Sequence, residues 1–283
     1  MLKKITLLFC VFPLLIVAQN DLLNELDSIA TPNEVVTSAF KSLKIVNLES
    51  TKLASKGDLY FVVAHRFGYF NNGFEDFFGL DEANTRLQFV YGLTDGISVH
   101  ASRSGFQKSY EFAVKYRLLS QKTTGSPFEI VGFNSLAINT ELDKVLLPKI
   151  EFSDRLSYVN QILISRKFND KLSLEMAPTY FHENYVSNNS QDNSQFALGL
   201  GGRYKLTKRW SFNMDYAAHL NRANNSVFKN PLSIGFDLET GGHVFQMHFS
   251  NSQAMHESGY LGNTAGNWGD GQIAFGFNLV RVF

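Results

Sequence analysis

Few side chains of this chain have the type and spacing for covalent or metal chemistry, and His248 and Ser250 are the sharpest pair among them. An imidazole that takes the proton of a nearby serine hydroxyl makes that oxygen a nucleophile for esters. The other histidines lack the spacing of a metal site, and the carboxylates between Glu75 and Glu82 match no calcium-loop pattern. The sequence therefore predicts no metal and no cofactor, and leaves one catalytic alternative.

The strand pattern around this pair decides whether it could reach a lipid. Phe245, Met247 and Phe249 alternate with polar residues, so His248 and Ser250 lie on the opposite, polar face of a strand. The run His248-Phe249-Ser250-Asn251 resembles the His-x-Ser-Asn element of outer-membrane phospholipases and lipid A deacylases, in which the pair faces the membrane. Because the pair here takes the polar face, we expect no enzymatic activity, and a lipid hydrolase remains the alternative.

The same alternation recurs after Gly57 in stretches of about ten residues, the period of a β-strand with one apolar and one polar face. Tyr110, Phe112 and Val114 share the apolar face of one such stretch. Twelve candidate strands begin near residues 58, 84, 97, 108, 128, 155, 171, 194, 209, 231, 243 and 272. Alternation is weak in the stretches 128–138 and 155–168, so we predict about twelve strands.

The connections between these stretches alternate between short and long. Thr94-Asp95-Gly96 and Thr240-Gly241-Gly242 suit the positive φ angles of tight hairpin turns. The connections Glu183–Asn193 and Asn251–Gly271 are longer and polar. This layout is typical of Gram-negative outer-membrane barrels, with periplasmic turns and extracellular loops. We therefore predict an all-β fold, a transmembrane antiparallel up-and-down β-barrel with both termini on the periplasmic side.

A soluble β-sandwich or lipocalin-like barrel would also alternate, but with its apolar face inward. Bulky aromatic residues, 14% of the chain, fill the apolar face, whereas Ala197, Gly199 and Gly201 lie on the other face and suit a lumen. We therefore expect outer-membrane lipid to contact the apolar face. The charged residues predicted to line the lumen are Arg66, Arg86, Glu111, Lys115, Arg117, Glu175, Arg203, Lys205, Asp215, Asp237 and Glu239.

Composition and the first residues predict location and exclude one class of partner. Basic and acidic residues number 26 each, so no basic excess is available for nucleic acid. Lys3 and Lys4 precede an apolar run that ends at Ala18, the pattern of a signal peptide cleaved near that residue. The one cysteine, Cys10, lies in this segment. We predict secretion through the inner membrane, with residues 1–18 removed, and insertion into the outer membrane.

Residues 19–56 differ from the barrel predicted over residues 57–283. Thr31-Pro32-Asn33-Glu34 has the form of a helix capping box, and Val36, Phe40 and Leu43 follow at helical spacing. The sequence predicts a short amphipathic helix here. A periplasmic lead-in is the favoured position, and a plug inside the lumen is the alternative.

The final strand and several motifs carry a resemblance to known barrels. The strand Ile273–Phe283 ends on Phe283 and resembles the C-terminal signal read by the barrel assembly machinery, which we expect as a partner. Motifs along the chain are Lys56-Gly57-Asp58, His65-Arg66-Phe67-Gly68, Phe77-Phe78-Gly79-Leu80-Asp81, Gly201-Gly202-Arg203-Tyr204-Lys205-Leu206 and Gly266-Asn267-Trp268-Gly269. They resemble a Bacteroidetes family of outer-membrane β-barrels of unknown function, domain of unknown function family 5777. The resemblance implies the barrel and its location, and no functional residue.

A barrel of about twelve strands lies between filled eight-stranded barrels and open pores of sixteen or more strands. We therefore expect a narrow channel for small polar solutes. The alternative without transport is a structural or surface-interaction barrel.

Overall fold

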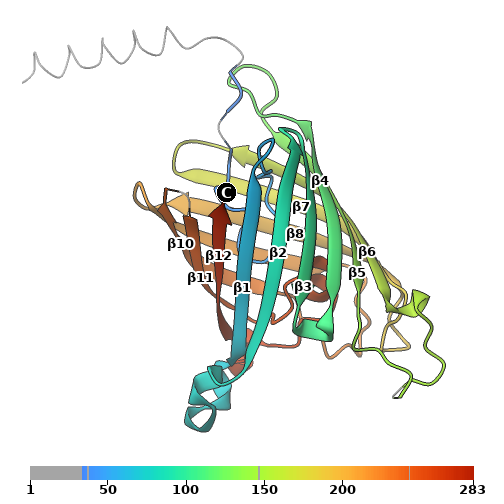
Figure 1. The fold of residues 1–283 in the computed structure, drawn as a ribbon. Coiled ribbons are helices and arrows are strands. Elements are labelled where there is room, and N and C mark those ends of the chain that lie inside the picture. Colours follow the sequence, from blue (N-terminus) through green and yellow to red (C-terminus); the bar gives the residue numbers. More distant parts are fainter. Residues whose placement is uncertain (1–33, 37, 146, 242) are drawn as a thin grey trace, which may run out of the picture.

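The structure is a computed structural model that describes residues 34–36, 38–145, 147–241 and 243–283. Twelve antiparallel strands in this part of the chain form a closed barrel, in which each strand pairs with its neighbours in sequence (Figure 1). β12 (Ala274–Val282) closes the barrel against β1 (Leu59–Tyr69), with Tyr60 opposite Val282. Every strand begins within two residues of its predicted start. The expected signal peptide lies outside the described residues.

The remaining strands follow in chain order: β2 (Ala83–Thr94), β3 (Ile97–Ser104), β4 (Tyr110–Leu119), β5 (Glu129–Ile138), β6 (Leu156–Lys167), β7 (Leu172–Glu183), β8 (Ser194–Lys205), β9 (Trp210–His219), β10 (Leu232–Thr240) and β11 (His243–Ser250). Burial alternates along them because one face lies outside and the other inside. Phe112 is 51% exposed on the outside, whereas Lys115 is fully buried inside. The apolar face is thus the outer face, as a membrane barrel requires.

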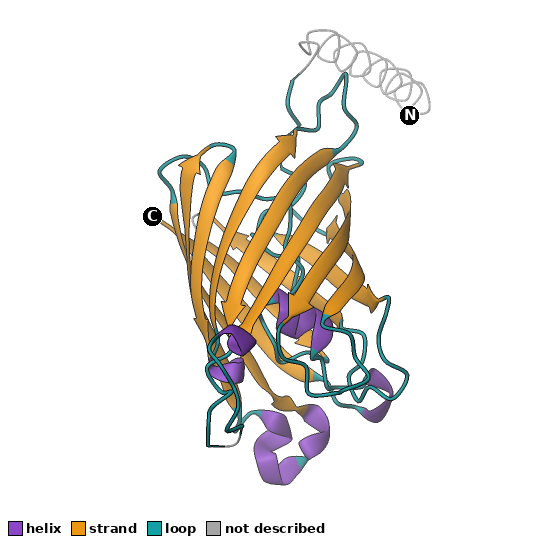
Figure 2. Ribbon diagram, turned by 90° about the vertical axis from the view of Figure 1, so that its right-hand side faces the viewer, coloured by secondary structure: helices purple, strands orange, loops and turns teal. Residues whose placement is uncertain are grey.

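The short turns, the connection 120–128 and the C-terminus share one end of the barrel, here called the turn end, and the remaining connections lie at the opposite loop end (Figures 1 and 2). The loop end carries the short helices η1 (Phe70–Asn72), η2 (Phe74–Gly79), η3 (Phe106–Lys108), η4 (Ser153–Arg155), α2 (Glu257–Gly262) and η5 (Trp268–Asp270). No helix in the described part of the chain is long and apolar enough to cross a membrane.

Residues 38–56, here called the plug, lie inside the barrel. Phe40, Ile45 and Leu48 are buried among lumen-facing side chains of the wall. The helix expected between Pro32 and Leu43 is wrong in its described part, because residues 34–36 and 38–43 form an isolated bridge and bends. The backbone of residues 34–36 bonds the connection after β4 instead: the N–H of Val36 donates to the carbonyl of Gln121, and the carbonyl of Glu34 accepts from the N–H of Thr123, each at 2.9 Å. Pro32 lies outside the described residues.

The connection between β11 and β12 also folds into the lumen, from the loop end. Residues 251–266, here called the inward loop, include the fully buried helix α2. Tyr260 and Leu261 pack into the same apolar cluster as Phe40 and Leu48 of the plug. Val131 of β5 belongs to this cluster too, so β5 is apolar on both faces. This explains its weak alternation in sequence.

Candidate functional site

Most of the charges predicted to line the lumen are buried inside it. Arg66, Arg86, Glu111, Lys115, Glu175, Arg203, Asp215 and Asp237 are buried, whereas Arg117, Lys205 and Glu239 are partly exposed near the turn end. Arg86 pairs with Glu111, and Arg203 pairs with Glu239. Both pairs form along the wall, between strands two places apart, so they leave the centre of the barrel to the plug.

Asp215 of β9 holds both inserted segments. Its Oδ2 accepts hydrogen bonds from the backbone N–H groups of Val46, Asn47 and Leu48, at 3.0, 2.7 and 2.9 Å. Its Oδ1 accepts the hydroxyl of Tyr260 on the inward loop at 3.2 Å. Burying a carboxylate away from water costs free energy unless hydrogen-bond donors contact its oxygens. The plug and the inward loop thus satisfy one wall charge together.

A second junction consists of buried ion pairs around Glu49 of the plug. Glu49 lies 2.7 Å from Nζ of Lys115 on β4 and 2.9 Å from Nζ of Lys44, and Lys44 lies 2.5 Å from Glu257 of α2. Burial alone would raise the pKa of Glu49, but Lys115 and Lys44 outweigh it and hold that pKa below its usual range. Burial would lower the pKa of Lys44, but Glu257 and Glu49 outweigh it and raise that pKa. The plug is therefore joined by ion pairs both to the wall, at Lys115, and to the inward loop, at Glu257.

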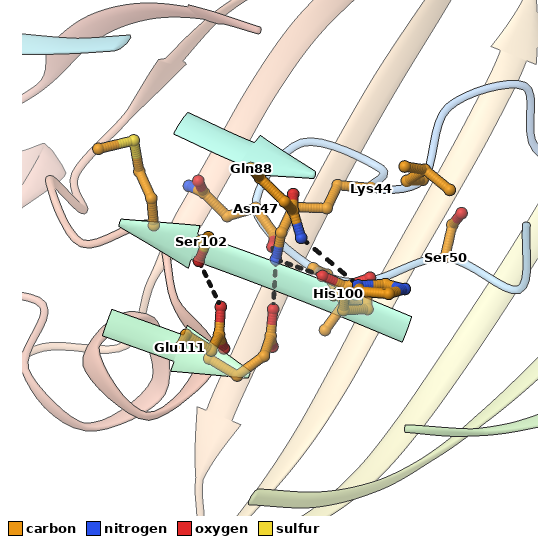
Figure 3. A network of polar contacts seen from close by, with 12 residues as sticks. Lys44, Asn47, Ser50, Gln88, His100, Ser102 and Glu111 are labelled. Atoms are coloured by element: carbon orange, nitrogen blue, oxygen red, sulfur yellow. Dashed lines mark hydrogen bonds and ion pairs between the residues drawn. The ribbon is translucent and has the colours of Figure 1, made fainter. Parts of the chain in front are cut away.

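Figure 3 shows the polar contacts beside this junction, where plug residues face strands β2, β3 and β4. His100 of β3 lies 3.4 Å from Nε2 of Gln88 and 3.2 Å from the hydroxyl of Ser98. Ser102 donates to Glu111 at 3.3 Å. The wall here is polar, in contrast to the apolar wall of β5.

Asn47 joins the plug to the wall beside β1. Its Oδ1 accepts from Arg66 at 2.7 Å, and its Nδ2 donates to the hydroxyls of Ser233 and Ser250, each at 3.0 Å. The interior position of Arg66 followed from alternation. No periodic pattern marked Lys44, Asn47 or Glu49 as partners of wall charges. The available signal was that these three polar residues interrupt the otherwise apolar stretch 43–49.

The candidate catalytic pair, His248 and Ser250, lies inside the barrel, on the polar face of β11 that the alternation predicted. His248 is buried, and neither ring nitrogen has a hydrogen-bond partner among the described residues. The hydroxyl of Ser250 pairs with Ser233 and Asn47 instead of with His248. The pair is thus neither assembled as nucleophile and base nor open to membrane lipid. In the described part of the chain, no three His, Cys, Asp or Glu residues group as metal ligands.

Two spaces remain in and beside the filled lumen. A gap of about 20 Å³ separates the plug from the wall near Arg66, Gln88 and Asn278. A cavity of about 300 Å³, here called the loop-end cavity, opens among the long connections. It is lined by Phe106, Gln107, Asn139, Leu142, Glu183, Tyr185, Val186, Ser187, Asn188, Gln191, Gln195, Ser226, Phe228, Gly262, Asn263 and Ala265. The gap beside the plug has room for about one water molecule, so among the described residues it offers no passage to a larger solute.

A family model described as a membrane bound beta barrel domain (DUF5777) matches residues 40–283. Similar solved structures include the NanC porin, with 11% identity and a TM-score of 0.50 over 79% of this chain and 98% of the porin. The KdgM porin has 9% identity and a TM-score of 0.45, over 80% of this chain and 98% of the porin. An outer membrane channel from Pseudomonas putida F1 has 13% identity and a TM-score of 0.45, over 82% of this chain and 97% of the channel. No curated protein matches in sequence. The likeness to NanC supports the barrel fold alone.

Proposed function

The chain belongs to the membrane bound beta barrel domain family, and we propose that it is an outer-membrane channel for small polar solutes, closed in this structure by the plug and the inward loop. One observation carries the proposal. The closure is made by two segments that enter from opposite ends. Both segments bond Asp215 of the wall, and the Lys44–Glu257 ion pair joins them beside the apolar cluster that they share. Such contacts can exchange for water, so the segments can separate without breaking the barrel.

The wall supports a path on one side of the plug. Gln88, Gln246 and Asn278 face the plug with amides, and the gap of about 20 Å³ lies against this wall. Amides and hydroxyls that bond the plug in the closed state would bond water and solute once the plug moved. On the other side, Val131 and Leu163 hold the plug through apolar contact.

Two disulfide locks test the proposal in planar-bilayer recordings of the full mature chain. The hydroxyls of Thr51 and Ser165 lie 2.7 Å apart, so Thr51→Cys with Ser165→Cys ties the plug to β6. The hydroxyls of Ser157 and Ser258 lie 2.9 Å apart, so a second pair of cysteines ties the inward loop to the same strand. Cysteine cross-links form cleanly because the mature chain is expected to lack other cysteines.

We expect Lys44→Met to produce stepwise openings that the wild type shows rarely. Oxidising the Thr51–Ser165 lock in that background should abolish them, and a reductant should restore them. Lys41→Met is the matched control, since Lys41 is largely exposed and its contact with Glu239 is 3.9 Å long. Silence of Lys44→Met in reducing buffer, with the barrel shown to be folded, would refute transport and favour a structural barrel.

A further inference from the structure

The loop-end cavity has the composition of a binding site. Its residues come from five connections of the loop end, those after β3, β5, β7, β9 and β11, together with Glu183 at the end of β7 and Gln195 on β8. At about 300 Å³ it lies at the lower end of the range for small-molecule pockets, enough for about one or two sugar rings.

The lining is rich in amides and nearly free of charge. Six amide side chains contribute to it: Gln107, Asn139, Asn188, Gln191, Gln195 and Asn263. An amide both donates and accepts, as a hydroxyl does, so this lining matches a ligand with many hydroxyl groups. Phe106, Tyr185 and Phe228 add aromatic faces, against which the C–H face of a sugar ring can pack.

The one charged residue of the lining, Glu183, is already engaged by protein donors. Its Oε2 accepts from Nε2 of Gln195 and its Oε1 from Nδ2 of Asn263, both at 2.8 Å. Each of these amides keeps its carbonyl oxygen for a ligand hydroxyl. A cationic ligand would have to displace the two amides, and an anionic ligand would meet the carboxylate. The lining therefore favours an uncharged ligand.

Among the polar side chains of the lining, Gln107 and Tyr185 are large and have no protein partner. Neither the amide of Gln107 nor the hydroxyl of Tyr185 has a hydrogen bond within the described residues. Gln107 also has a φ of 53°, a left-handed conformation that non-glycine residues rarely adopt. Such conformations are concentrated at binding and catalytic positions. From the cavity, its amides and these two groups, we infer that the loop-end cavity binds a neutral sugar.

Titration calorimetry of the full mature chain tests this inference. The protein is kept in a detergent without a sugar head group, and the probes are maltose, lactose and cellobiose, with glucosamine and glucuronate as charged sugars. We expect saturable binding of at least one neutral disaccharide and weaker binding of both charged sugars. Absence of binding by all three neutral sugars, or tighter binding of a charged one, overturns the inference.

Variants then locate the site. Gln107→Ala and Tyr185→Ala should each weaken binding roughly tenfold, since each removes a ligand contact without removing a side-chain hydrogen bond within the described residues. Asn189→Ala is the matched control, because Asn189 is exposed on the same loop as Tyr185 but lies outside the cavity. Circular dichroism checks that each variant is folded. Unchanged affinity in both cavity variants would place the sugar elsewhere and refute the assignment.

That the bound sugar is also the transported solute rests on the proposed function. Liposome swelling with the same sugar separates the two ideas. Binding without swelling, in the unlocked Lys44→Met variant, leaves the site standing and refutes the channel. Swelling that is insensitive to Gln107→Ala and Tyr185→Ala, with no measurable binding, leaves the channel standing and refutes the site.

Discussion

Replacing Asp215 by Asn should loosen the plug by an amount that the structure allows us to calculate. Asn keeps the volume of the side chain but removes its charge and one of its two acceptor oxygens. Three backbone N–H groups of the plug, on Val46, Asn47 and Leu48, then bond a neutral partner or none. A bond to a charged group contributes about 1 kcal/mol more than a neutral bond, so the three together give about 3 kcal/mol. The exposed state of the plug should gain about a hundredfold in population.

Native-state hydrogen exchange read by mass spectrometry measures this population. Peptides that contain residues 44–50 should exchange about a hundredfold faster in Asp215→Asn, while strand peptides of β4 and β5 keep their rates. Ser211→Ala is the matched control, because Ser211 lies on the same strand and face as Asp215 but bonds Arg203. Equal exchange of the plug in Asp215→Asn and wild type would show that this carboxylate does not hold the plug.

Three further predictions test other parts of the structure. Phe112→Cys should resist aqueous maleimide in membranes, whereas Asn189→Cys should react readily; equal labelling would refute the outer apolar face. Gly201→Val should push Ile45 of the plug inward and speed plug exchange at a cost of about 1–3 kcal/mol, because a Cβ at this position meets the Ile45 side chain. Ser250→Ala should leave phospholipid hydrolysis at the background of the wild type; activity that is present in wild type and lost in this variant would restore the enzyme alternative.

The barrel could be predicted from the sequence because its signal is periodic. One residue in two faces lipid, so alternation gave the strand starts and the interior position of Asp215 and Arg66 without knowledge of any partner. The weak alternation of β5 has a structural cause in the plug. Val131 is apolar and faces the lumen because an apolar side of the plug covers it.

The plug could not be predicted in the same way, because its contacts join residues far apart in the chain. Asn47 bonds Ser233 and Ser250, about two hundred positions away, with no repeat that relates them. The capping-box pattern before Val36 is a local signal, and local helix preference is worth only tenths of a kcal/mol per residue. Residues 34–36 instead bond the backbone of the connection after β4, and Phe40 packs into the apolar cluster of the lumen. These long-range contacts outweigh the local preference, so no helix forms in residues 34–36 and 38–43.

The inward loop connects the two proposals and makes them quantitatively dependent on each other. Helix α2 has Glu257, the partner of Lys44 in the plug, at one end, and Gly262 beside Asn263 of the loop-end cavity at the other. A sugar that changes the position of α2 must change the free energy of the plug, and thermodynamic linkage then requires the plug to change sugar affinity by the same factor.

We therefore expect bound sugar to alter the rate of hydrogen exchange in the plug. We also expect the Thr51–Ser165 lock, which holds the plug closed, to alter sugar affinity. If saturating sugar speeds exchange of residues 44–50, the oxidised lock should weaken binding relative to the reduced form, and if sugar slows exchange, the lock should strengthen binding. Calorimetry of both redox forms and hydrogen exchange with and without sugar give the two effects separately. A sugar that binds in the cavity while exchange and affinity both stay unchanged would show that α2 does not couple the cavity to the plug.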